Sequence, residues 1–208
     1  MGDTTIPTDS SGTPLPASLQ GYFLISETEL LDPNFRQTVV LLVNHNEEGA
    51  FGLVVNRPAE LTLGDVVSEF EELPIGDTPT FIGGPVEQHY LFALHSGLPN
   101  SARSEFAMTP AEGITFEPVF QAMETYFRDE WPQIADEQRP QLAFYLGYAG
   151  WGPGQLEGEL REKAWLVIPA DADIVFHADP EEGWNAALTK KGGLYSIVAQ
   201  TGSKPSMN

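Results

Sequence analysis

The stretch of this sequence with the most scope for chemistry is a glycine-rich run that follows a predicted strand. It reads Gly-Tyr-Ala-Gly-Trp-Gly-Pro-Gly-Gln-Leu-Glu-Gly-Glu over residues 147–159. Glycine permits positive φ and close backbone approach, so amides ahead of the next helix could point at a ligand. The glycine spacing fits neither a dinucleotide fingerprint nor a phosphate loop, which needs Gly-Lys-Ser/Thr. The alternative is a structural chain reversal in which Trp151 covers the core.

Two further turn segments could hold a ligand against bare backbone. Gly-Gly-Pro (83–85) follows one predicted strand and Asn-Arg-Pro (56–58) ends another. Arg57 could hold a carboxylate or phosphate through two parallel bonds, or form an ordinary ion pair. The glycine pair could instead mark a bulge or a sharp exit from a sheet. We expect these segments and the glycine-rich run to cluster at one rim. The candidate binding residues are Asn56, Arg57, Pro58, Gly83, Gly84, Pro85, His95, Tyr148, Gly150, Trp151, Gly152, Gly154, Gln155 and Glu159.

Metal, cofactor and nucleophile signals are weak in this chain. It contains no cysteine, and its four histidines show neither i, i+4 nor His-x-His spacing. No Gly-x-Ser-x-Gly elbow is present to expose a serine. Carboxylates are too numerous for two to be chosen as acid and base. We therefore expect no metal and no cofactor, and we assign no catalytic residue.

The charge balance restricts the class of partner. The 208 residues include 30 Asp and Glu but only 10 Lys and Arg, a formal net charge of −20. Nucleic-acid binding requires a basic surface, so direct binding of DNA or RNA is not expected. The N-terminus lacks the basic and apolar segments of a secretory signal, and the longest apolar run, residues 39–43, is far shorter than a membrane span. A cytoplasmic protein with no membrane association is expected.

Apolar periodicity predicts more strands than helices. Strands are expected at 21–25, 38–43, 50–55, 80–82, 90–95, 142–148 and 164–168, with weaker candidates at 103–108 and 114–116. Helices are expected at 63–70, after a capping box formed by Thr62 and Asp65, and at 118–131, 155–160 and 181–189. The turn at 46–49 predicts a hairpin. Short early connections favour antiparallel or mixed sheets, so the predicted class is α+β.

The domain organisation follows from composition. Residues 1–18 are rich in Ser, Thr, Pro and Gly and predict a disordered tail. Residues 19–190 contain no linker or repeat and predict a single domain. Residues 191–208 are polar and are expected to form a frayed C-terminal tail.

Several short motifs together resemble the AlgH/YqgE family of bacterial proteins. They occur in the family's order at 21–26, 32–42, 49–58, 83–86, 94–95, 147–157 and 164–171. Where the family often has Cys-Glu-His after the second strand, this chain has Val-Asn-His at 43–45. The resemblance implies a bacterial cytoplasmic protein with mixed, mostly antiparallel sheets in a flattened pseudo-barrel flanked by helices. Members of the family are labelled as transcriptional regulators, but the family has no established catalytic or DNA-binding residues.

Three functional hypotheses remain open at this point. The first is a non-enzymatic regulatory or binding protein that contacts an unknown protein partner or a small molecule at the predicted rim. The second is an enzyme of unknown reaction on a small anionic substrate, with Arg57 holding the anion and His95 or Glu159 transferring protons. The third, direct DNA binding, rests on the family label alone, because the predicted helices at 63–70 and 118–131 are acidic.

Overall fold

The computed structural model describes residues 8–9, 12–27, 32–118, 120–177 and 179–201. Within these ranges the backbone forms strands and helices of the predicted α+β class. The strands are β1 (Tyr22–Ser26), β2 (Val39–Asn46), β3 (Gly49–Val54), β4 (Pro58–Thr62), β5 (Pro79–Ile82), β6 (Val86–His95), β7 (Met108–Ala111), β8 (Ile114–Glu117), β9 (Leu142–Trp151) and β10 (Trp165–Pro169). The α-helices are α1 (Leu63–Val66), α2 (Gln121–Asp129), α3 (Gln155–Arg161), α4 (Ala172–Val175), α5 (Gly183–Lys191) and α6 (Leu194–Thr201). Short 3-10 helices are η1 (Ser68–Phe70), η2 (Asn100–Ala102), η3 (Trp131–Gln133), η4 (Asp136–Gln138) and η5 (Pro180–Glu182).

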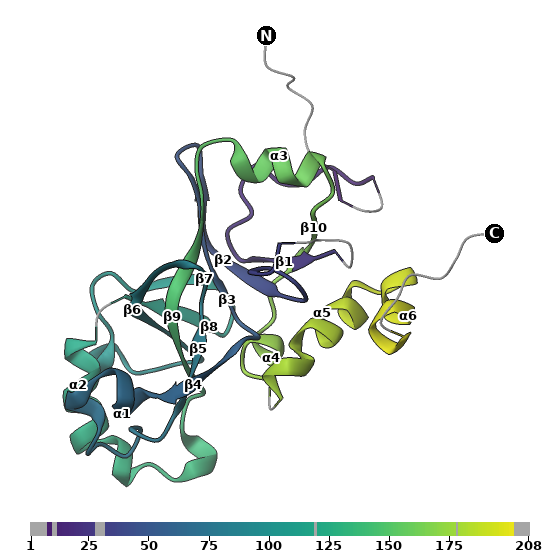
Figure 1. Cartoon of the computed structure of the whole chain (residues 1–208). Coiled ribbons are helices and arrows are strands. Elements are labelled where there is room, and N and C mark those ends of the chain that lie inside the picture. Colours follow the sequence, from purple (N-terminus) through teal and green to yellow (C-terminus); the bar gives the residue numbers. More distant parts are fainter. Residues whose placement is uncertain (1–7, 10–11, 28–31, 119, 178, 202–208) are drawn as a thin grey trace.

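One curled sheet organises the molecule (Figure 1). Its main path runs β10-β1-β2-β3-β9-β6-β8-β7, and β5 lies beside this path, paired with β4 and with β9. The β5–β9 pairing is parallel, whereas the pairings along the main path are antiparallel. The expected mostly antiparallel, barrel-like sheet flanked by helices is therefore confirmed as a curled half-barrel.

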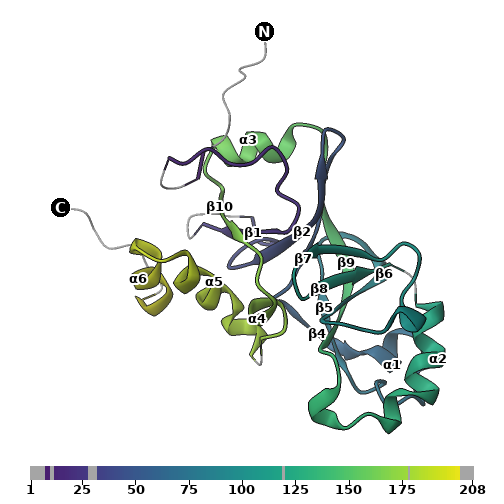
Figure 2. The same ribbon diagram turned by 180° about the vertical axis from the view of Figure 1, so that it is seen from behind.

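Three apolar clusters fill the space around this sheet. The inner cluster lines the inside of the curl and is closed by α4, α5 and α6. The outer cluster lies on the other face of β1, β2 and β10, beneath α3 and the N-terminal segment. The third packs α1, η1 and α2 against β6 and β9. Figures 1 and 2 accordingly show α5 and α6 along one flank and α1 and α2 at the opposite end.

The β2–β3 hairpin forms around the predicted turn and carries a β-bulge. Leu42 pairs with Gly52 and Asn44 pairs with Phe51, so Val43 is the extra residue. Strict alternation from Leu42 would place Asn44 next on the outer face, but the bulge brings His45 to that face instead. Bulges commonly redirect a side chain in this way, and this one builds the site described below.

Several predicted elements differ from the observed ones. The capping box at Thr62 is present, with the Asp65 carboxylate accepting from the Thr62 amide at 2.8 Å, but α1 ends at Val66 and η1 follows. Helix α2 begins at residue 121 instead of 118. The strand expected at 103–108 is wrong, because β7 begins only at Met108. Strand β4 was not predicted, and β9 continues to Trp151, so the part of the glycine-rich run at 147–151 is strand.

Both predicted tails are partly ordered. Within the N-terminal tail, Leu15 packs against the outer cluster and the Ser18 hydroxyl donates to the His45 carbonyl at 2.8 Å; residues 1–7 and 10–11 lie outside the described residues. The expectation of fraying after residue 190 is wrong for 194–201, which form α6 and bury Val198 against the inner cluster. Packing against α5 stabilises a segment whose own sequence is a weak helix former.

Candidate ligand site beneath the N-terminal segment

The structure places the segment 83–85 between the other two predicted turn segments: the Ile82 amide donates to the Arg57 carbonyl at 2.8 Å, and Gly84 lies against the backbone of Tyr148. Ala50 pairs with Trp151 near one end of β3. Asn56 lies six residues further along the chain, roughly 20 Å away for extended backbone. The structure therefore separates residues 56–58 from residues 150–155, and each group has a structural task of its own.

Asn56 and Arg57 fix the loop that precedes β2. The buried Asn56 side chain accepts from the Val39 amide at 2.8 Å and donates to the Gln37 carbonyl at 2.9 Å. The Arg57 guanidinium donates to the Asn34 carbonyl at 2.7 Å, and partial burial lowers its pKa. These bonds give Arg57 a structural role that uses part of its five N–H donors; Pro58 begins β4.

Gly83 and Gly84 let two chain segments cross at close range. A Cβ on Gly84 would lie 2.1 Å from the carbonyl carbon of Tyr148, and one on Gly83 would lie 2.3 Å from the Gly147 oxygen. Both distances are impossible for real atoms, so the glycines are required for packing against β9. Pro85 follows at an exposed position.

The second half of the glycine-rich run is organised by Glu159. Its carboxylate accepts from the indole N–H of Trp151 at 2.9 Å and of Trp165 at 2.7 Å, and from the side-chain amide of Gln155 at 3.0 Å. Gln155 in turn accepts from the Gly152 amide at 3.1 Å. The nearby Gly150 and Gly154 are exposed, and Gly154 takes φ +73° at the start of α3. Glu159 thus serves as a shared acceptor that fixes two buried tryptophans.

His95 lies apart from these segments and is fully buried. Its Nδ1 accepts from the Leu98 amide at 3.0 Å, and Nε2 lies 3.7 Å from the carboxylate of Glu117, which is also fully buried. Burial, and then the positive charge of Arg103, lower the pKa of His95 to about 4. Glu117 accepts from the amide and hydroxyl of Ser104. A side chain without solvent exposure cannot exchange protons with a ligand at the surface.

A different site emerges between the N-terminal segment, β2 and α3. It is a cavity of about 240 Å³, and five of its lining residues are apolar. Its polar groups are His45, whose side chain is 4% exposed, and Glu157, at 37%. The lining residues are Leu15, Pro16, Ala17, Leu19, His45, Glu157 and Leu160.

The hydrogen bonds of His45 define its proton position. Nδ1 accepts from the Leu19 amide at 2.9 Å, so this nitrogen carries no proton. Nε2 must then carry the proton of the neutral ring, and it donates to the Glu157 carboxylate at 3.0 Å. The ring connects the N-terminal segment to α3, and both of its nitrogens are already engaged.

Sequence reasoning missed this pair for a physical reason. Alternation along residues 39–45 places His45 on the inner face, and only the bulge at Val43 reverses this assignment. The available signals were the position of Glu157 in the glycine-rich run and the matching histidine of the family's Cys-Glu-His motif.

Neither a membrane span nor a metal site is found in the described part of the chain. No helix within these residues is sufficiently long and apolar to cross a bilayer. The same residues contain no group of three or more His, Asp and Glu side chains placed to hold a metal ion.

The fold and the cavity define a class of α+β protein with a curled half-barrel sheet and an apolar cavity beneath its N-terminal segment. The AlgH-like family model matches residues 23–196, so the chain belongs to the AlgH-like family. A UPF0301 protein of Thioalkalivibrio sulfidiphilus is 38% identical over 180 residues, 85% of this chain and 91% of that protein. The UPF0301 protein AlgH of Pseudomonas aeruginosa is 39% identical over 198 residues, 90% of this chain and 96% of AlgH.

Two solved structures share the fold. The solution structure of AlgH from Pseudomonas aeruginosa superposes with a TM-score of 0.67 at 33% identity, covering 94% of this chain and 99% of that one. A crystal structure of a Corynebacterium diphtheriae protein gives a TM-score of 0.71 at 19% identity, covering 89% of this chain and 92% of that one. The names of these relatives describe no reaction.

Proposed function

We propose that this protein is a non-enzymatic binding protein of the bacterial cytoplasm that takes a small molecule into the cavity around His45 and Glu157. One observation carries the proposal: a largely apolar cavity is lined by the buried imidazole of His45, which is hydrogen-bonded to the carboxylate of Glu157. Small-molecule sites combine apolar walls with a few polar groups in this way. A cavity of about 150 Å³ holds benzene, so about 240 Å³ admits a single ring or a short chain with a polar end.

The polar groups favour a ligand that donates hydrogen bonds. His45 uses one acceptor position of Glu157, and a carboxylate offers about four. A ligand ammonium would form a charge-assisted bond there, whereas a ligand carboxylate or phosphate would be repelled. We therefore favour an amine on an apolar body over the anionic substrate of the enzyme hypothesis.

Catalysis is disfavoured by the same geometry. A general base needs a free lone pair, and that of His45 Nδ1 accepts from Leu19. The Ser18 hydroxyl donates to the His45 backbone carbonyl, so the imidazole does not activate it. Arg57, His95 and Glu159 are engaged elsewhere, as described above.

A regulatory role would follow from the position of the N-terminal segment. Leu15, Pro16 and Ala17 line the cavity, and Leu19 is bonded to His45. A ligand would therefore alter the contacts that hold this segment against the domain. A partner protein could read that change without any contact between this chain and DNA.

Thermal unfolding with matched ligand pairs tests the proposal. Phenethylamine and hexylamine are compared with phenylacetate and hexanoate, each at concentrations up to the millimolar range. Saturation at 100 times Kd adds about 2.7 kcal/mol, or roughly 5–10 °C in Tm for a chain of this size. Glu157→Gln should reduce the shift with amines, while Glu162→Gln, an exposed position just after α3, should leave it unchanged. Shifts only with carboxylates, or no shift with either amine, would refute the proposed site.

A further inference from the structure

Four aromatic rings meet on the inner face of the sheet, on the opposite side of β3 from the cavity. Phe51 lies between the others, with ring centroids 5.5 Å from Phe92, 5.6 Å from Phe116 and 4.9 Å from Tyr148. Phe92 and Phe116 also stack at 5.5 Å. These residues come from β3, β6, β8 and β9, which are neighbours in the sheet. The cluster therefore spans four adjacent strands.

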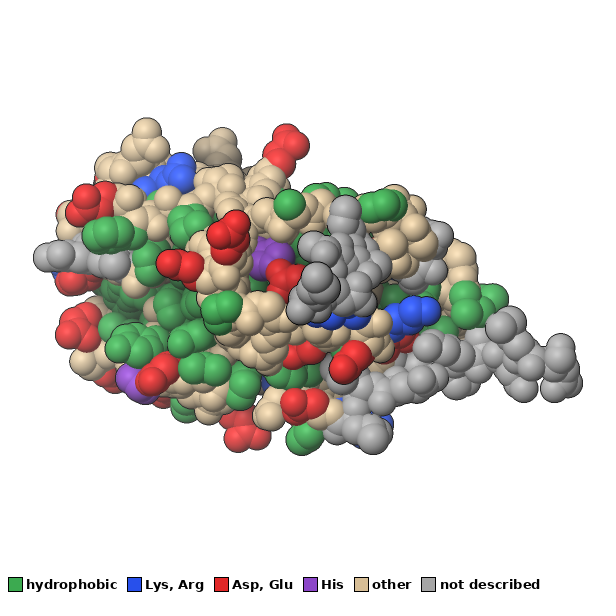
Figure 3. Space-filling model, turned by 90° about the horizontal axis from the view of Figure 1, so that it is seen from above, with side chains coloured by type: hydrophobic (Ala, Val, Ile, Leu, Met, Phe, Trp, Pro, Cys, Tyr) green, Lys and Arg blue, Asp and Glu red, His purple; other side chains and the backbone are tan. Residues whose placement is uncertain are grey.

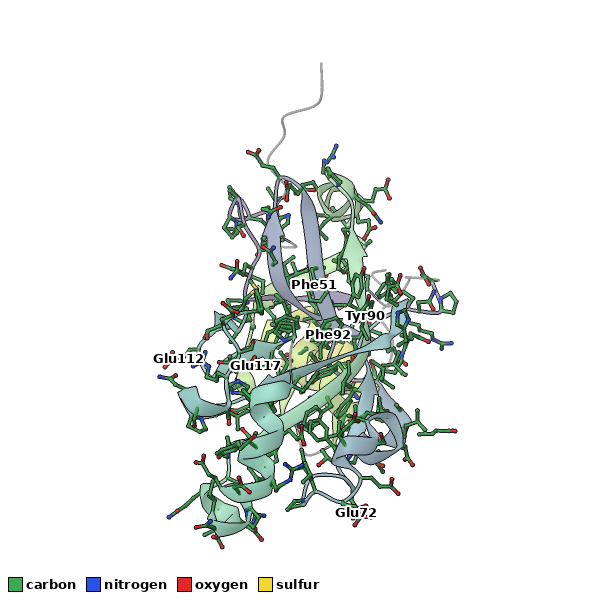
Figure 4. All side chains as sticks on the ribbon, turned by 90° about the vertical axis from the view of Figure 1, so that its left-hand side faces the viewer. Phe51, Glu72, Tyr90, Phe92, Glu112 and Glu117 are labelled. Atoms are coloured by element: carbon green, nitrogen blue, oxygen red, sulfur yellow. The ribbon has the colours of Figure 1, made fainter. Side chains whose placement is uncertain are left out.

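This cluster is only partly covered. Phe51, Phe92 and Tyr148 are each partly exposed, whereas Phe116 is 5% exposed. Tyr90 precedes Phe92 by two residues on β6, at the end of the irregular register between Val86 and Leu91, and it is 54% exposed. Figure 4 shows Phe51, Phe92 and Tyr90 together at the centre of this side of the molecule. We call these five residues the aromatic face.

The border of the aromatic face is acidic. Glu47 and Glu48 occupy the exposed hairpin turn three or four residues before Phe51. Glu87 lies beside Val86, which pairs with Tyr148; its side chain is 48% exposed, and its carboxylate lies 3.2 Å from Nε2 of the exposed His89. In the view of Figure 3, hydrophobic side chains gather on the side where β6 and β7 lie, with acidic side chains around them. The acidic border belongs to a chain with a net charge of −20.

We propose that the aromatic face docks a basic segment of a partner protein, in which Lys or Arg residues flank an aliphatic or aromatic side chain. Exposed contiguous apolar surface marks interaction sites, and the acidic border supplies charge complementarity to such a segment. A second copy of this chain would bring another charge of −20 against the same border. Nucleic acid would be repelled by it.

Binding of short labelled peptides tests this assignment by fluorescence anisotropy on the full chain. The probe has the sequence Lys-Lys-Ser-Leu-Phe-Ser-Lys-Lys. One control peptide replaces every Lys with Glu, and another replaces Leu-Phe with Ser-Ser. The proposal predicts that the probe binds with Kd below about 100 μM, weakens as salt rises, and exceeds both controls in affinity by at least about fivefold.

Matched variants locate the binding. Tyr90→Ser and Glu87→Lys should each weaken binding of the probe by about fivefold or more. Ile197→Ser changes another exposed apolar residue, at 46% on α6, and Glu72→Lys makes the same charge change at an exposed site near η1. Figure 4 shows Glu72 well away from the aromatic face. These two controls should stay within twofold of the parent.

Three results would overturn the proposal. The first is no binding of the probe below 100 μM at low salt, and the second is equal weakening by the remote and the local variants. The third is self-association in sedimentation velocity that Tyr90→Ser abolishes, which would assign the aromatic face to a second copy. Amine binding in the cavity is measured separately, so the two proposals can fail independently.

Discussion

Replacing Glu159 with Leu tests whether the role of its carboxylate is structural or catalytic. Its side chain accepts from two indole N–H groups that belong to Trp151 and Trp165, each only 6% exposed. A buried donor left without its partner costs about 1–3 kcal/mol. Because Glu159 itself is partly exposed, water will reach part of the vacated site, and we take the lower half of that range for each indole. Glu159→Leu should therefore lower the free energy of unfolding by about 2–4 kcal/mol.

Urea and thermal unfolding, followed by circular dichroism and tryptophan fluorescence, measure this loss. The expected decrease in Tm is roughly 4–16 °C for a chain of this size. Glu159→Gln retains an oxygen acceptor for the indoles and should lose less. Glu162→Leu, at an exposed position near the same helix, should change stability by no more than about 0.5 kcal/mol. Equal stability of Glu159→Leu and Glu162→Leu would refute the structural role and return Glu159 to the list of proton-transfer candidates.

Two further predictions concern the crossing at β9 and the buried histidine. Gly84→Ala places a Cβ 2.1 Å from the backbone of Tyr148 and should sharply reduce the yield of folded protein. Gly97→Ala is the control, because Gly97 has nearly the same φ but open space around it, and it should fold normally. Soluble expression and urea unfolding midpoints compare the two variants. The pKa of His95 is about 4 when folded and roughly 6.5 when unfolded, so the unfolded chain binds the extra proton between these values. The free energy of unfolding should therefore fall as the pH drops from about 6.5 towards 4. His95→Asn, which keeps an acceptor for the Leu98 amide, should flatten this part of the profile; an unchanged slope would contradict the assignment.

The elements that the sequence predicted well are those determined by residues close together in the chain. The hairpin turn at 46–49 and the capping box at Thr62 each depend on residues within four positions of one another. Strand β4 has few strand-forming residues and pairs with β5 at its two ends across an irregular register, so little in its own sequence indicates it. Helix α6 likewise depends on burial of Val198 against distant residues.

The candidate site was less predictable because it depends on long-range geometry. His45 and Glu157 are 112 residues apart, and their 3.0 Å contact requires the bulge in β2 as well as the placement of α3. The predicted rim was a reasonable inference from strand ends. In the structure its residues form the backbone crossing at β9 and fix the loop before β2, and a shared binding role for them stays a prediction.

Titration of ¹⁵N-labelled protein with phenethylamine, observed by NMR, determines whether the cavity around His45 and Glu157 binds an amine. The Leu19 amide donates a hydrogen bond to the His45 ring at the wall of the cavity. The amide signal of Leu19 and the ring nitrogen signals of His45 therefore report on whether the cavity is occupied. We expect saturable shifts that are largest for the Leu19 amide, the His45 ring and neighbouring residues of α3, and that weaken strongly in Glu157→Gln. Saturable binding that perturbs other parts of the molecule and leaves these signals unchanged, or no perturbation at millimolar amine, would contradict it.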